Sequence, residues 1–230
     1  MSKSKKNTID PEKIMNQYGA DAVRFFILSD SPPEKDVQWS EQGMIAAFKF
    51  IQKFWILHNK IISEIKNKKM KKENDDLSVF TNKLIEKYTF SLEKFNMNVL
   101  IAYLHETYNF LNKEIDNLNT KDLEENYLKI LILMFPVLPH LISECLKDLG
   151  KDKDVSWPLA QKKYLEEKYV NIVIQINGKK RSLIKIEKNL DEKIVLENVK
   201  KDKKISNFLE KKSVIKHIIV KNKLVNLIVK

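Results

Sequence analysis

Three residues near the amino terminus have side chains suited to contact phosphate. Ser2 and Ser4 flank Lys3, so hydroxyl groups alternate with an ammonium group. A lysine is a mobile point charge, and it can stabilise the negative charge that grows on a leaving pyrophosphate. The serines can donate further hydrogen bonds without the bulk that would slow loop closure. Lysine-rich strings are usually only solvated, so a phosphate-handling role for this one depends on its sequence context.

A second group of cations, Lys179, Lys180 and Arg181, directly follows the dipeptide Asn177-Gly178. This dipeptide is typical of a type I′ turn, which would present the three cations at the tip of a β-hairpin. Residues 166–230 carry 17 Lys or Arg against 8 Asp or Glu, whereas the rest of the chain carries 25 against 23. Such an asymmetry is expected of a surface that binds nucleic-acid phosphates. The competing interpretation is a codon bias towards lysine, because only two of the 42 basic residues are arginines.

Other kinds of chemistry find little support. The sequence contains four histidines, far apart from one another: His58, His105, His140 and His217. This scatter argues against a metal site. The single cysteine, Cys145, lies in an apolar stretch, excludes an internal disulfide and is expected to be a buried small hydrophobe in a reducing, cytoplasmic setting. The longest apolar run, residues 130–135, is far shorter than the roughly 20 residues of a membrane span, so we expect no membrane segment.

The apolar spacing predicts a mainly α protein with a small α+β domain at its carboxy end. Helices are expected at residues 11–18, 21–28, 40 to about 65, 77–94, 98–115, 123–135 and 138–149, as an antiparallel bundle. In the long helix, one apolar face is expected from Met44, Phe48, Ile51, Trp55, Ile62 and Ile65. Strands are expected at residues 169–176, 179–186, 214–220 and 224–229, with short helices at 194–199 and 205–209. The second domain would then have the order ββααββ.

Both ends of the sequence resemble class I aminoacyl-tRNA synthetases. Met1-Ser2-Lys3-Ser4 is similar to their Lys-Met-Ser-Lys-Ser signature loop (KMSKS) without its first lysine, and Gly19-Ala20-Asp21-Ala22-Val23-Arg24 is similar to the Gly-Ala-Asp-x-x-Arg helix that follows that loop. Ser31-Pro32-Pro33-Glu34 and the later pair Trp39-Ser40 resemble elements of the leucyl-tRNA synthetases. Ile174-Gln175-Ile176-Asn177-Gly178-Lys179 resembles the strand that opens the carboxy-terminal domain of the bacterial-type leucyl enzymes. The resemblance covers essentially the whole chain.

The resemblance implies three parts with different roles. Residues 1–39 would be the KMSKS loop and the helices that leave the catalytic domain. Residues 40–165 would be an anticodon-binding-type helical bundle, and residues 166–230 a small α+β domain that binds tRNA. Together they would form the carboxy-terminal portion of a leucine–tRNA ligase, an enzyme that attaches leucine to tRNA-Leu through a leucyl-adenylate.

The same resemblance assigns roles to the two groups of cations. Lys3, assisted by Ser2 and Ser4, would act on the phosphates of ATP, with Mg²⁺ accompanying ATP in the complete enzyme. The cations of the hairpin tip, Lys179 to Arg181, would contact tRNA. No residue is expected to ligate a metal directly.

Much of the parent enzyme has no counterpart in the sequence. The His-Ile-Gly-His loop, the nucleotide-binding Rossmann core, the leucine pocket and the editing domain are missing, so we expect the chain alone to bind neither ATP nor leucine and to be inactive. We also expect it to be a monomer. Two alternatives stay open. The chain could be a free-standing, non-catalytic tRNA-binding module, or the equivalent portion of a valyl- or isoleucyl-tRNA synthetase. The Ser-Pro-Pro-Glu element and the Asn-Gly hairpin favour the leucyl family over these relatives.

Overall fold

The computed structural model describes residues 9–30, 32, 34–67, 75–153, 155–166, 169–209 and 212–230. The chain divides into two compact units, residues 1–165 and residues 166–230. The helices of the first unit are α1 (Pro11–Tyr18), α2 (Ala20–Asp30), α3 (Glu41–Asn67), α4 (Asp76–Glu93), α5 (Met97–Glu114), the 3₁₀ helix η2 (Ile115–Asn117), α6 (Thr120–Met134), α7 (Pro139–Asp148) and α8 (Lys162–Leu165). The second unit contains β1 (Tyr169–Ile176), β2 (Lys179–Glu187), α9 (Glu192–Lys201), α10 (Lys203–Leu209), β3 (Val214–Val220) and β4 (Leu224–Val229). The predicted fold class is confirmed.

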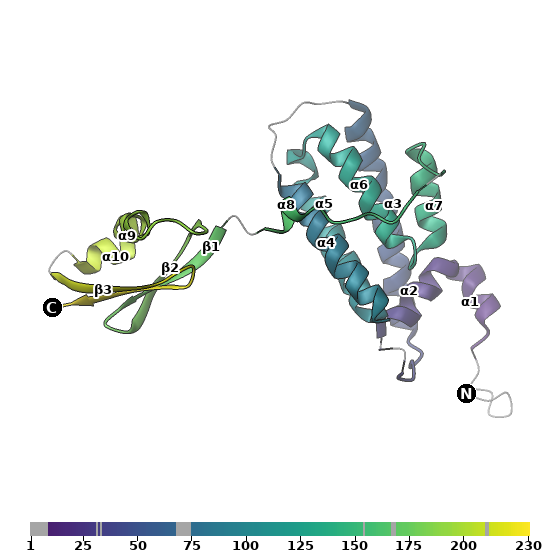
Figure 1. Cartoon of the computed structure of the whole chain (residues 1–230). Helices are drawn as coiled ribbons and strands as arrows, with labels where there is room; N and C mark the ends of the chain where they lie inside the picture. Colours follow the sequence, from purple (N-terminus) through teal and green to yellow (C-terminus); the bar gives the residue numbers. More distant parts are fainter. Residues whose placement is uncertain are drawn as a thin grey trace. The chain divides into compact units, whose positions relative to one another are not determined.

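The helices of the first unit pack as a bundle (Figure 1). The long helix α3 contacts α2, α5, α6 and α7, while α4 packs against α5, α6 and α8. One continuous apolar core runs through these contacts, from Ala22 to Leu146. Among the helices that the structure describes, none combines the length and apolar character needed to cross a membrane.

Local signals explain how the first helices begin and end. Asp10 caps α1, because its carboxylate accepts a hydrogen bond from the Glu12 amide at 3.1 Å, and Pro11 occupies the first helical position, where no amide donor is needed. Gly19 separates α1 from α2 with a φ of 85°, a conformation that side chains disfavour. The predicted boundary between the two helices is therefore confirmed.

The buried face of α3 differs in part from the prediction. Met44 is buried as expected, whereas Trp55 is 37% exposed. Phe48, Ile51 and Ile65 are only partly buried. The remaining fully buried apolar residues of the helix lie along a neighbouring ridge: Ala47, Phe50, Phe54, Leu57 and Ile61. The apolar stripe of α3 is broad because several helices contact it, and its centre is set by those neighbours rather than by its own sequence.

The second unit is a four-stranded sheet with the strand order β2-β1-β4-β3. The hairpins β1–β2 and β3–β4 are antiparallel, and β1 and β4 join them as a parallel pair from Val173 opposite Leu224 to Ile176 opposite Leu227. Helices α9 and α10 lie on one side of the sheet (Figure 1). Alternate residues of β1 and β4 form the core beneath them, with Ile174 and Val225 fully buried.

Candidate nucleic-acid interface

The structure places the two predicted groups of site residues differently. Ser2, Lys3 and Ser4 lie outside the described residues, as do Ser31 and Pro33 of the Ser-Pro-Pro-Glu element. Lys179, Lys180 and Arg181 are consecutive exposed residues at the start of β2.

The turn that carries these cations is fixed to the centre of the sheet. Asn177 and Gly178 have φ values of 49° and 78°, as a type I′ turn requires. The Asn177 side chain pairs with Val229 of β4: its oxygen accepts from the Val229 amide at 2.9 Å, and its nitrogen donates to the Val229 carbonyl at 3.1 Å. The Gly178 amide donates to the Asn226 side chain at 3.1 Å. The Asn177 amide also donates to the Leu227 carbonyl at 2.9 Å. Because these bonds hold the turn to another strand, Lys179 and Lys180 project from a well-defined tip.

The third cation, Arg181, makes an additional contact with α10. Its guanidinium carbon lies 4.7 Å from the centre of the Phe208 ring. The ammonium of Lys212 lies 4.7 Å from the centre of the same ring. Phe208 itself is half-buried and packs against the core of the second unit. An aromatic face attracts cations, so the ring restrains two side chains that come from different segments.

Helix α10 is held in place next to Arg181 by Asp202. One carboxylate oxygen of Asp202 accepts hydrogen bonds from the amides of Lys204 and Ile205 at 3.0 and 3.1 Å, which caps the helix. The other oxygen accepts from the Ser182 hydroxyl at 2.9 Å. Ser182 directly follows Arg181 and is buried. This bridge fixes the start of α10, and with it Phe208, relative to β2.

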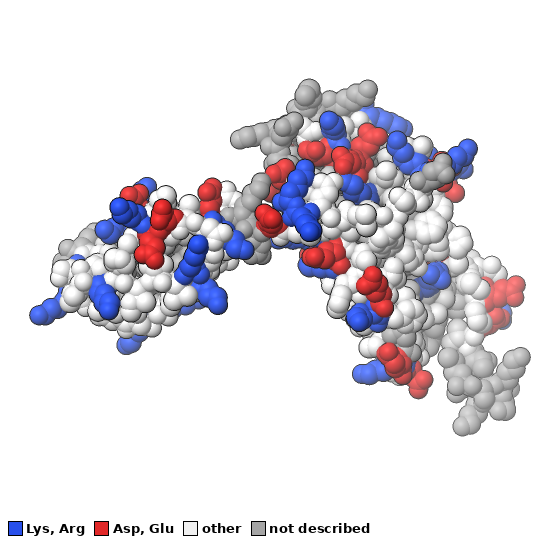
Figure 2. All heavy atoms as spheres, viewed as in Figure 1, with Lys and Arg blue, Asp and Glu red and all other residues white. Residues whose placement is uncertain are grey.

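The basic residues of the second unit are distributed over its surface. On the face shown in Figure 2, Lys and Arg side chains spread across this unit, and some acidic side chains lie between them. No single block of positive charge covers that face. The contacts of individual cations, rather than the overall charge, therefore distinguish one basic position from another.

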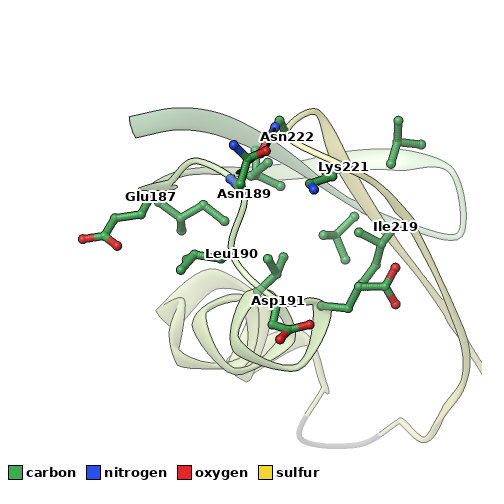
Figure 3. A pocket seen from close by; sticks show the side chains of 13 residues that line it. Glu187, Asn189, Leu190, Asp191, Ile219, Lys221 and Asn222 are labelled. Carbon is green, nitrogen blue, oxygen red and sulfur yellow. Dashed lines mark hydrogen bonds between the residues drawn. The ribbon is translucent and has the colours of Figure 1, made fainter. Parts of the chain in front are cut away.

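A cavity of about 350 Å³ lies at the opposite end of β2, beside α9 and the β3–β4 turn (Figure 3). Its wall includes the paired side chains of Asn189 and Asn222, which are joined by a hydrogen bond of 3.0 Å. Its lining combines apolar side chains with the acidic residues Glu187, Asp191 and Glu192 and with Lys221. Because the carboxylates outnumber the ammonium, this cavity is unsuited to phosphate. Sequence reasoning did not predict it.

In the first unit, Asp21 of the Gly-Ala-Asp-x-x-Arg helix binds the start of α7, and Arg24 binds the turn between α6 and α7. The buried Asp21 carboxylate accepts from the Leu141 amide at 2.7 Å and lies 2.8 Å from Nδ1 of His140. Arg24 donates to the carbonyls of residues 136 and 137 at 2.7 and 3.3 Å. Four polar contacts, which we call the α2 clamp, thus join α2 to the bundle. The sequence motif indicated the helix but not its partner.

A second polar cluster is buried in the bundle. Nδ1 of His58 lies 2.9 Å from the Tyr127 hydroxyl, and Nε2 lies 3.2 Å from the Asp148 carboxylate. Burial lowers the pKa of His58 from its usual 6.5, although Asp148 opposes the shift. Burial also raises the pKa of the nearby Cys145 thiol to about 12. The prediction of a buried Cys145 is confirmed, and a thiol with this pKa is a poor nucleophile.

Neither polar cluster has the composition of a metal site. Within the part of the chain that the structure describes, no three His, Cys, Asp or Glu side chains come together as ligands. The α2 clamp and the His58 cluster instead pair one histidine with one carboxylate each. Such pairs stabilise the packing of helices.

Residues around α1 and α2 also line an apolar cavity of about 290 Å³. Its lining residues are all hydrophobic or proline: Ile9, Pro11, Ile14, Val23, Phe26, Ile27, Val37 and Trp39. Ile27 is 48% exposed although it lies in the middle of α2. An open apolar surface of this kind suits contact with another protein segment.

Comparison with known proteins gives consistent family matches over two parts of the chain. Residues 76–196 match a family model described as the anticodon-binding domain of tRNA ligase. Residues 1–40 match a second model, described as tRNA synthetases class I (I, L, M and V).

Individual relatives match along the whole chain. It is 34% identical to a leucine–tRNA ligase of Petrotoga mobilis, with 100% of this chain and 30% of that protein covered, and 37% identical to one of Orientia tsutsugamushi, with 100% and 27% covered. The chain thus spans less than a third of the length of these relatives. A solved ternary complex, Agrobacterium radiobacter K84 LeuRS with tRNA and LeuAMS, has a similar fold, with a TM-score of 0.77 and 22% identity over 100% of this chain and 31% of that one.

Proposed function

The chain belongs to the family of anticodon-binding domains of tRNA ligases, and on that basis we propose that it is the carboxy-terminal portion of a leucine–tRNA ligase. The observation that carries this proposal is the similarity to leucine–tRNA ligases, which extends over 100% of the chain for the Petrotoga and Orientia proteins. The proposed parent reaction joins leucine to tRNA-Leu at the expense of ATP, through a leucyl-adenylate. We place it in the cytoplasm and expect the chain to be a monomer.

The proposal divides the work between three parts of the chain. Residues 1–39 supply the signature loop, residues 40–165 the tRNA-binding bundle, and residues 166–230 a further tRNA-binding domain. The α2 clamp joins the first two of these parts, because Asp21 and Arg24 tie the synthetase-like start of the chain to the start of α7 and the turn before it. The apolar cavity beside α2 is a suitable surface for the catalytic core to cover.

In the complete enzyme, Lys3 would stabilise the charge that develops on the phosphates of ATP, with Ser2 and Ser4 as additional donors. ATP is a substrate in this scheme, and Mg²⁺ would arrive with it. The described residues offer no cluster of carboxylates for that ion. Lys179, Lys180 and Arg181 would contact the phosphates of tRNA-Leu.

Two measurements on the purified chain of 230 residues test the proposal. First, tRNA-Leu transcripts should bind with an affinity that falls as salt increases, because phosphate contacts release counterions. Second, leucine-dependent pyrophosphate exchange should stay at background, because the sequence contains no counterpart of the His-Ile-Gly-His loop of the catalytic core. Failure to bind tRNA even at low salt would contradict the proposal.

Parallel titrations identify the family member. Preferential binding of tRNA-Leu over tRNA-Val and tRNA-Ile is the expected result. A preference for either competitor would assign the chain to a different class I synthetase. Equal binding of all three would favour the non-catalytic module, which binds tRNA without selecting an amino acid.

A further inference from the structure

We propose that Arg181 and Lys212 form a single phosphate-binding clamp for the RNA backbone, positioned by the ring of Phe208. The inference rests on the proposed tRNA-binding function and deepens it, because it specifies which cations act together and what holds them. Lys212 and Phe208 lie outside the hairpin tip that carries Lys179, Lys180 and Arg181. They follow Arg181 by 31 and 27 positions in the sequence.

The clamp is defined by two equal distances. The guanidinium of Arg181 and the ammonium of Lys212 each lie 4.7 Å from the centre of the Phe208 ring. The two positive centres are therefore no further apart than twice that distance. Within this limit, two cations can contact the same phosphate or two neighbouring ones.

The electrostatics of the pair favour an anion between the two side chains. Two like charges within about a Debye length of each other, roughly 8–10 Å at physiological salt, repel without full screening. The negative face of the Phe208 ring offsets part of that repulsion. A phosphodiester would offset more of it, because it carries a full negative charge and accepts several hydrogen bonds.

The groups that hold the clamp leave its donors accessible. Arg181 and Lys212 are exposed, whereas Phe208 is half-buried against the core. When a guanidinium lies against a ring, its edge remains free to donate two parallel hydrogen bonds to phosphate oxygens. The Ser182–Asp202 bridge of 2.9 Å fixes α10 to β2, so the ring is already in place before RNA binds. Phe208 is thus a positioning residue, and the two cations make the contact.

The central test compares Phe208→Leu with Phe208→Tyr in the full chain, titrated with a tRNA-Leu transcript at several salt concentrations. Leucine keeps an apolar side chain against the core but removes the ring face, so we expect the affinity to fall by about tenfold, the lower end of the value of one charged hydrogen bond. The log–log salt slope should fall by roughly 0.7–0.9 for each phosphate that the variant no longer neutralises. Tyrosine keeps the ring and should retain both affinity and slope.

The double variant Arg181→Gln, Lys212→Gln distinguishes a structural role for Phe208 from a positioning role. Phe208→Leu is introduced into that double variant, which lacks both cations. If Phe208 acts through these cations, Phe208→Leu should cause no further decrease in affinity in that background. A further decrease of equal size would overturn the positioning role. The matched control is Tyr169→Leu, because Tyr169 is another ring of this unit that carries a cation, Lys185 at 5.3 Å. An equal effect of both ring deletions would also overturn the proposal.

A second measurement does not depend on how Phe208→Leu folds. Arg181→Gln and Lys212→Gln alter exposed side chains, so both variants should fold. The fold-decrease in tRNA affinity of the double variant should be smaller than the product of the two single fold-decreases. Strictly independent effects would contradict a shared contact. If the unaltered chain bound no tRNA, the clamp and the proposed function would both be overturned. If the unaltered chain bound tRNA and Phe208→Leu left both the affinity and its salt dependence unchanged, the clamp alone would be overturned.

Discussion

Removing the carboxylate of Asp21 should loosen the first unit. The Asp21 side chain is 8% exposed, and its hydrogen bond to the Leu141 amide measures 2.7 Å. A bond to a charged group contributes about 1.5–3 kcal/mol, and its removal leaves the Leu141 amide without that acceptor. The partner His140 is 74% exposed, so its contact adds little. We therefore expect Asp21→Ala to lower the free energy of unfolding by about 2–3 kcal/mol.

Asp21→Asn should lower the free energy of unfolding by about half as much as Asp21→Ala. Its amide oxygen can still accept a hydrogen bond from the Leu141 amide, but it carries no charge. The assay is urea unfolding followed by tryptophan fluorescence. It reports this unit alone, because all three tryptophans precede residue 166: Trp39, Trp55 and Trp157. With a typical urea dependence, the Asp21→Ala midpoint should fall by about 1 M. The exposed Asp152, changed to Ala, is the control. Equal midpoints for Asp21→Ala and Asp152→Ala would refute the proposed importance of the α2 clamp.

Three further outcomes are expected. Because burial lowers the pKa of His58 in the folded state, the unfolded chain binds more protons than the folded chain near and below pH 6.5. The free energy of unfolding should therefore decrease as the pH is lowered through that range. Urea midpoints measured at pH 5.5 and 7.5 should show this decrease, and His58→Gln should make it smaller. In a complete enzyme carrying this segment, Lys3→Ala should raise the activation free energy of adenylate formation by about 3 kcal/mol, with little change in leucine affinity. An unchanged rate of pyrophosphate exchange would exclude Lys3 from catalysis. Changing Lys179, Lys180 and Arg181 together to Gln should make tRNA binding less dependent on salt. The log–log slope of affinity against salt concentration should fall by roughly 0.7–0.9 for each phosphate left without its cation. The variant should stay folded, which circular dichroism can verify.

Features set by neighbouring residues were predictable from the sequence. The hairpin turn at Asn177-Gly178 is an example, because a type I′ turn needs positive φ at two adjacent positions and these two residues tolerate it. The cap of α1 at Asp10 is another, since donor and acceptor are two positions apart. Both were predicted from residue types alone.

Features set by distant residues were not predictable in the same way. The Asp21–His140 contact joins positions 119 apart, and the His58–Asp148 contact joins positions 90 apart. A search for ligands at short spacing misses such pairs, because only the packing of the helices brings them together. The parallel pairing of β1 with β4 was missed for the same reason: each hairpin is visible in the sequence, but the contact between hairpins is not.

The central position of the β1–β4 pair has a consequence for how the second unit is made. Its first and last strands are neighbours in the middle of the sheet, so the first hairpin has an open edge until β4 reaches it. Contacts of such long sequence separation form slowly. Strand β3 stays at an edge of the sheet even in the finished fold, with Ile215 and Ile218 exposed, so it is prone to pair with other chains. Lys221 and Lys223 follow β3 in the sequence, and charged residues that flank an apolar strand disfavour such aggregation.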